Sequence, residues 1–172
     1  MFWRSRLLSR SSAAGIAVAL MAGLVSGLSA PGAAGVRGMA YVVIASPDVP
    51  VADLSLAECR RICLLERTIW KPGLQITLLL PEASQPARSF MLRHIYHRDD
   101  IELRRMFLEK LFQGRIDYAP KVAHSDREAV SLVASAHGLL TLVPADTPGL
   151  DHVRVLSIDG KLPGQPNYPL SD

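Results

Sequence analysis

Short apolar runs that alternate with helix-start signals constrain the fold of this chain more than any other feature. Four runs rich in Val, Ile and Leu are typical of buried strands, and they cover residues 41–45, 75–80, 139–143 and 153–158. Helix starts lie between them: Ser84 with Pro86 close behind it, and capping boxes at Ser55–Glu58, Asp99–Glu102 and Ser125–Glu128. This alternation predicts an α/β fold, a three-layer sandwich around a mostly parallel sheet.

The N-terminal segment has the order of a secretory signal peptide. Three arginines within the first ten residues precede an apolar run at 13–28, and small residues follow it. We expect a leader over residues 1–34, cleaved between positions 30 and 40, and a periplasmic or secreted protein. The alternative is an uncleaved signal anchor. Residues 41–171 then form one domain, which is a sufficient length for a single core.

The basic character of the whole chain comes from this leader. Lys and Arg number 19 against 16 Asp and Glu, which gives a formal charge of +3. Residues 1–40 hold four arginines and no acidic residue, so residues 41–172 carry 15 basic and 16 acidic side chains and a net charge of −1. The arginines of the predicted helices also alternate with glutamates, which is typical of solvated faces. Nucleic acid is therefore not an expected partner.

Neither a metal site nor an enzyme is indicated. Cys59 and Cys63 are four residues apart on one predicted helix face, so we favour two buried thiols over a disulfide or a metal site. His94 and His97 are three apart, but no Cys or carboxylate with zinc-site spacing accompanies them. Nucleophile-elbow, phosphate-loop and dinucleotide motifs are absent from the sequence, so we expect no catalysis and no cofactor.

Residues 41–171 resemble the phosphate-type periplasmic substrate-binding proteins of ABC transporters, in particular short single-lobe relatives. The matching segments keep the family's order: Ser46-Pro47 after the first strand; Leu54-Ser55-x-x-Glu58-x-x-x-Ile62 with Trp70 and Gly73; residues 76–80 followed by Ser84-x-x-x-Arg88-x-Phe90; Phe112-x-Gly114 and Pro120; Ser125-x-x-Glu128-x-Val130-x-x-Val133; Gly138 to Val143; and Asp159-Gly160 before Tyr168 to Ser171. The resemblance implies one lobe of a type II periplasmic binding protein.

In that family an oxyanion is held by an arginine at a strand end and by a Ser-Gly-Thr turn at a helix start. Here Leu80 takes the arginine position, Ser84 is kept, and Gln85 and Pro86 replace the Gly and Thr. Pro86 removes one backbone N–H donor. The resemblance also implies that half of the two-lobed clamp is missing.

The helix start at Ser84 is still the best candidate for an anion site. Helix N-termini present free N–H groups and a positive dipole end, and Ser84, Gln85 and Arg88 can add donors. The alternative is that Ser84 caps its own helix and Arg88 is a solvated surface residue.

Two functions follow from these residues. The first is an exported substrate-binding-protein-like module that binds a small oxyanion such as phosphate weakly, with a membrane permease or envelope protein as partner. The alternative is a ligand-free interaction or structural protein of the periplasm or cell envelope. That protein reuses the lobe for partner binding or self-association, because a missing second lobe exposes an apolar edge.

Overall fold

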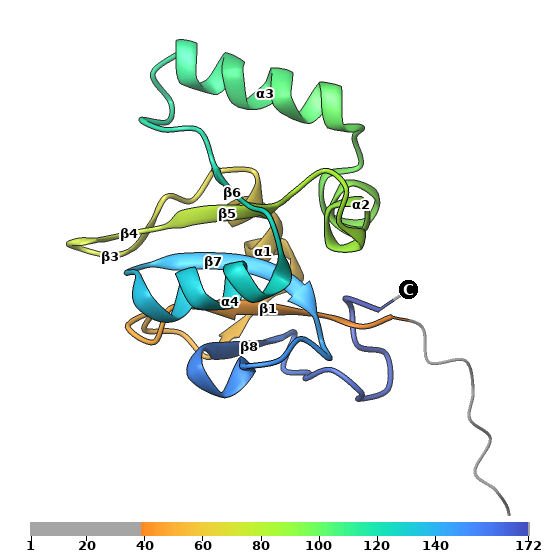
Figure 1. Cartoon of the computed structure of the whole chain (residues 1–172). Coiled ribbons are helices and arrows are strands. Elements are labelled where there is room, and N and C mark those ends of the chain that lie inside the picture. The colour runs from red at the N-terminus through yellow and green to blue at the C-terminus, as the bar shows by residue number, and fades with distance from the viewer. Residues whose placement is uncertain (1–38, 172) are drawn as a thin grey trace, which may run out of the picture. The chain divides into compact units, whose positions relative to one another are not determined.

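A six-stranded sheet organises this computed structural model, which describes residues 39–171 (Figure 1). The strands lie in the order β2-β8-β1-β7-β5-β6. Their bounds are β1 Tyr41–Ala45, β2 Asp53–Leu54, β5 Thr77–Pro81, β6 Lys121–Ala123, β7 Leu139–Pro144 and β8 Arg154–Ile158. A separate hairpin joins β3 (Ile69–Lys71) to β4 (Leu74–Gln75). The predicted leader lies outside the described residues.

The sheet is mixed but mostly parallel, as expected. β5 runs parallel to both β7 and β6, and β2 runs parallel to β8. β1 is antiparallel to β7 on one side and to β8 on the other, with Val43 opposite Leu142 and Leu156. The α/β sandwich with a mostly parallel sheet is therefore confirmed, and its first strand lies in the interior of the sheet.

Three helices begin after the capping residues that the sequence predicts, Ser55, Asp99 and Ser125, whereas the helix expected to start at Ser84 begins after Gln85. Their bounds are α1 Leu56–Cys63, α2 Pro86–Met91, α3 Asp100–Phe112 and α4 Asp126–Ser135, with a short 3₁₀ turn η2 at Leu150–His152. Complete capping boxes form at Ser55 and Asp99. At Ser125 the box is half formed: its hydroxyl accepts the Glu128 N–H, but the Glu128 carboxylate accepts the N–H of His124 instead of that of Ser125.

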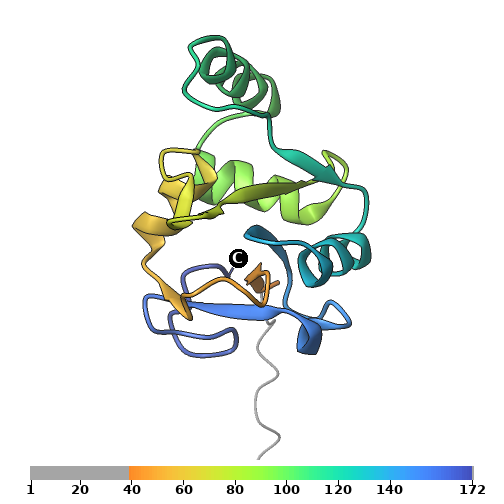
Figure 2. The same ribbon diagram turned by 90° about the vertical axis from the view of Figure 1, so that its left-hand side faces the viewer.

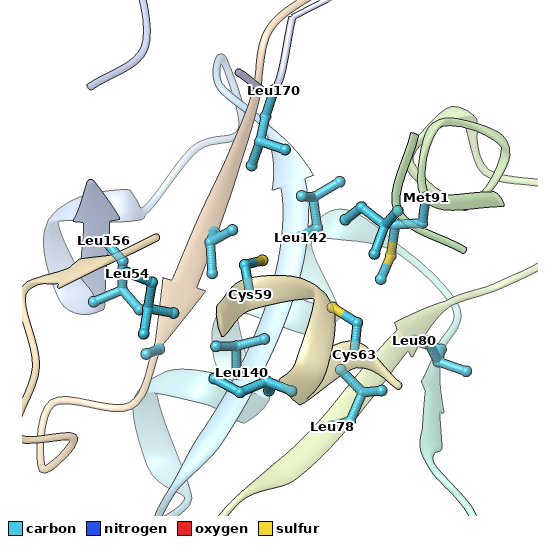
Figure 3. Packing of buried hydrophobic residues seen from close by; sticks show 14 of the residues in the cluster. Leu54, Cys59, Cys63, Leu78, Leu80, Met91, Leu140, Leu142, Leu156 and Leu170 are labelled. Atoms are coloured by element: carbon cyan, nitrogen blue, oxygen red, sulfur yellow. The ribbon is translucent and has the colours of Figure 1, made fainter. Parts of the chain in front are cut away.

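Two apolar layers lie on opposite faces of the sheet because side chains alternate along each strand. Residues 41, 43 and 45 of β1 face the layer covered by α1 and α2, and residues 42 and 44 face α4. Figure 3 shows the first layer, in which Cys59 and Cys63 of α1 lie among Leu140, Leu78 and Leu54. Both thiols are free and buried, which confirms that prediction.

Aromatic residues complete the first layer. Phe90 is fully buried and stacks on Tyr41 and His94, with ring centroids 4.3 Å apart in each pair. Trp70 is buried as well and donates its indole N–H to the Gly138 carbonyl at 3.0 Å. Both aromatics therefore serve as core residues.

Several short elements were not among the predicted strands and helices. Strand β6 lies within residues 114–123, and Trp70 lies in the β3–β4 hairpin. The helix that begins at Pro86 continues as a π-helix, η1, at Leu92–Tyr96. Within residues 39–171, no helix has the length and apolar character needed to cross a membrane.

Candidate functional site

Strands β5 and β6 end at the same edge of the sheet, and a helix starts beyond each of them. Figures 1 and 2 show the two strands side by side, with α2 and α4 on opposite faces of the sheet. Pro81 and Ala123 are level in the register. Open α/β sheets bind ligands outside the carboxyl ends of their strands, so this edge is the candidate site.

Ser84 and Gln85 form the turn before α2. Ser84 is exposed, and Gln85 is the N-cap residue. Gln85 makes no side-chain capping bond, and its amide Nε2 instead donates to the Ala123 carbonyl at 2.9 Å. Its backbone N–H donates to the Glu82 carbonyl at 2.9 Å. The turn is thereby fastened to β6, and Ser84 is left facing solvent.

Arg88 is buried and pairs with Asp100, the first residue of α3. Its side chain is 7% exposed, and Nε and Nη2 donate to the same carboxylate oxygen at 3.0 and 2.7 Å. The third nitrogen, Nη1, is buried without a hydrogen-bond partner. Arg104 binds the other oxygen of Asp100 at 2.7 Å. Arg88 therefore links α2 to α3 through two of its three guanidinium nitrogens, Nε and Nη2.

The alternative interpretation, in which Ser84 caps α2 and Arg88 is a solvated surface residue, is wrong on both points. The N-cap residue is Gln85, and Arg88 is buried. The structure brings Ser84 and Gln85 together in one turn and places Arg88 one turn later, with its guanidinium engaged by α3.

Carboxylates surround the neighbouring start of α4. Glu82 lies 3.6 Å from the His124 ring, and Asp126 holds a buried oxygen that has no hydrogen-bond partner. Burial, followed by the charge of Asp146, raises the pKa of Asp126. The first turn of α4 holds Asp126 and Glu128, which disfavour a bound anion, whereas the first turn of α2 holds no acidic residue, so the start of α2 is the better of the two for an anion.

Sequence reasoning missed Asp100. Asp99 and Asp100 stand together, and the pattern assigns Asp99 to the capping box, which it forms. One residue can cap a helix start, so the second carboxylate was available for another partner. Nothing in the local pattern indicates that the partner is Arg88, which belongs to the preceding helix.

A pocket of about 540 Å³ opens near the start of β5, between the β3–β4 hairpin and the segment that leads into β6. Thr77, Ile116 and Tyr118 line it together with other residues, but Ser84, Gln85 and Arg88 do not. Within residues 39–171, no three His, Cys, Asp or Glu side chains are grouped to hold a metal ion.

Solved structures of phosphate transport proteins share this fold. An ABC-type phosphate transport receptor from Vibrio cholerae superposes with a TM-score of 0.60 at 17% identity, over 79% of this chain and 55% of that chain. PstS from Borrelia burgdorferi superposes with a TM-score of 0.59 at 14% identity, over 74% of this chain and 50% of that chain. A third structure is a phosphate ABC transporter substrate-binding protein, so assigned, from Clostridium perfringens, solved with bound phosphate. It superposes with a TM-score of 0.59 at 16% identity, over 74% of this chain and 48% of that chain.

These likenesses show the fold class: an α/β sandwich like that of part of these phosphate transport proteins. The chain spans about half the length of the structures that it matches. No protein-family model and no curated protein sequence matches it.

Proposed function

We propose that this chain is an exported substrate-binding-protein-like module, not an enzyme, and that it binds a small oxyanion such as phosphate weakly at the start of α2. One observation carries the proposal: α2 starts at the carboxyl edge of the parallel strands β5 and β6, where this fold class places ligands. Export rests on the leader predicted in residues 1–34.

Each of the three residues has a defined role in this proposal. The exposed Ser84 hydroxyl donates directly to the anion. The Gln85 amide uses one hydrogen on Ala123 and has a second to donate. Arg88 supplies positive charge from one turn further along α2, and Asp100 offsets part of that charge.

The same contacts explain why the affinity should be low. Pro86 has no N–H, and the N–H of Gln85 is already bonded to Glu82. An anion held by an open turn also stays in contact with water, where charge pairs contribute roughly 0–1 kcal/mol each. We therefore expect binding in the millimolar range.

Calorimetric titration of the purified chain with phosphate, and separately with sulfate, tests the proposal. Heat beyond dilution at millimolar ligand supports it, and its absence overturns it. Ser84→Ala should weaken binding by about two- to tenfold, the value of one hydrogen bond. Ser89→Ala, an exposed serine further along α2, is the matched control and should leave the affinity unchanged.

A second variant examines the role of Arg88 without removing it. Asp100→Asn removes the negative charge that neutralises the Arg88 guanidinium, so this variant should bind phosphate more tightly than the parent chain does. An unchanged affinity would exclude Arg88 from the site while leaving Ser84 in it.

A second candidate function is partner binding in the periplasm or cell envelope, with a permease or another envelope protein as partner. The observation in its favour is an exposed apolar face on α3, where Ile101, Leu108 and Phe112 are 71%, 51% and 86% exposed. Capture experiments with α3 variants as bait test it, since loss of a captured protein on changing Phe112 would assign the partner to this face.

A further inference from the structure

Helix α3 carries apolar side chains on two opposite faces. Leu103 and Phe107 are buried against the rest of the domain, and Phe107 meets Tyr96 edge to face. Lys110 adds a 2.7 Å hydrogen bond to the Leu64 carbonyl at the end of α1. Together with the Arg88–Asp100 pair, these contacts hold one face of α3 to the domain.

The outward face forms a stripe. At 100° per residue, Ile101, Leu108 and Phe112 lie within about 40° of one another around the helix axis, and Leu103 and Phe107 lie on the other side. A helix that is apolar on both sides is typical of one covered by two neighbours. The domain provides one of them.

We propose that the second neighbour is another copy of this chain, with two α3 helices packed antiparallel across a two-fold axis. Reversing the helix so that Ile101 lies opposite the partner copy's Phe112 brings the stripes together along their whole length. The same register sets Leu108 level with Arg105 of the other copy and places Arg105 beside Glu109 of that copy. This inference does not depend on anion binding.

The charges beside the stripe favour a second copy over an unrelated partner. Arg105 and Glu109 are exposed, and neither has an ion pair within the described residues. In the reversed register each Arg105 meets a Glu109, so two equivalent ion pairs border the apolar stripe. An interface that is complementary to its own inverted image is the property required of a two-fold dimer.

The expected dimer is weak, because one helix from each copy buries less than a standard interface of roughly 1,200–2,000 Å². In sedimentation equilibrium of the purified chain, the average mass should rise with concentration from that of one copy toward that of two. Phe112→Asp and Leu108→Asp should each hold the mass at one copy. Tyr118→Ser removes an equally exposed aromatic residue outside α3 and should leave the association unchanged.

Charge reversal tests the register itself. Arg105→Glu alone, or Glu109→Arg alone, sets like charges against each other and should weaken association by about tenfold. Mixing the two single variants restores both ion pairs in a heterodimer, and the double variant restores them in a homodimer. Both should return to within about threefold of the parent affinity. Circular dichroism confirms that each variant is folded.

Three outcomes would overturn the proposal. The first is a chain that remains monomeric at all concentrations, including one whose α3 binds a different protein. The second is association that all α3 variants retain, since contact would then lie elsewhere. The third is loss of association in both single charge variants without recovery in their mixture, which would exclude the antiparallel register. None of these results bears on phosphate titration, so the two proposals fail separately.

Discussion

Removing the charge of Asp100 should destabilise the domain far more than its position at a helix start suggests. Asp100→Asn keeps an oxygen in place to accept from Arg88 but leaves that guanidinium without a counter-charge, and the Arg88 side chain is 7% exposed. Losing one partner of a fully buried pair costs about 3–5 kcal/mol. Asp100 is 26% exposed, so water offsets part of the loss. We expect a decrease of about 2 kcal/mol in the free energy of unfolding.

The matched control is Glu102→Gln, which removes one carboxylate charge from the same first turn without touching Arg88. We expect it to lower the free energy of unfolding by about 0.3–1 kcal/mol, which is the contribution of one carboxylate's interaction with the helix dipole. Gln can still complete the capping box with Asp99. Urea denaturation followed by far-ultraviolet circular dichroism at neutral pH measures both variants. A loss for Asp100→Asn no larger than that for Glu102→Gln would refute the reasoning.

The pH dependence provides an independent check. Partial burial opposes ionisation of Asp100, but the hydrogen bond and charge of Arg88, followed by those of Arg104, outweigh it and lower the pKa below its ordinary value of 3.8. The carboxylate therefore stabilises the folded state above the unfolded pKa, and this contribution is lost as pH falls through the folded pKa. The difference in the free energy of unfolding between the parent and Asp100→Asn should therefore disappear in strong acid. A difference that persists there would show that the destabilisation is not electrostatic.

Two further predictions concern the core. Gly138→Ala should cost at least about 3 kcal/mol in urea denaturation, because a Cβ there lies 2.1 Å from the Gln75 carbonyl oxygen at a φ of +65°. Gly114→Ala has the same φ in open space and should cost about 1 kcal/mol; equal losses would contradict the steric argument. Cys59 and Cys63 should not react with a thiol reagent in the folded protein, because their mutual hydrogen bond and burial raise the pKa of Cys63. Both should react in denaturant without reductant, and failure to do so would indicate a disulfide.

The features that the sequence predicts are those encoded by neighbouring residues. A capping box joins residues three apart, so Ser55 and Asp99 reveal the starts of α1 and α3 directly. Apolar runs of five or six residues likewise identify β1, β5 and β7. The Ser125 box is half formed because Glu128 has a competing donor, the N–H of His124. Local patterns do not decide between two equally near donors.

The features that the sequence does not reveal depend on contacts between distant residues. β6 has three residues with two of them exposed, so it is a strand because β5 lies beside it rather than through its own apolar pattern. The partner of Arg88 is decided by how the following helix turns back. Phe112 and Ile101 belong to an apolar helix pattern, yet they lie on the side of α3 that the domain leaves open.

The place of β1 in the sheet has a consequence for the order in which the chain folds. Tyr41 pairs with Pro144 and Ala45 pairs with Arg154, so the first strand to emerge has both neighbours near the end of the sequence. Its five buried residues remain uncovered until almost the whole chain has been made. Such long-range pairing is slow to form. The two-sided pairing of β1 therefore makes completion of the central sheet depend on the last two strands, β7 and β8.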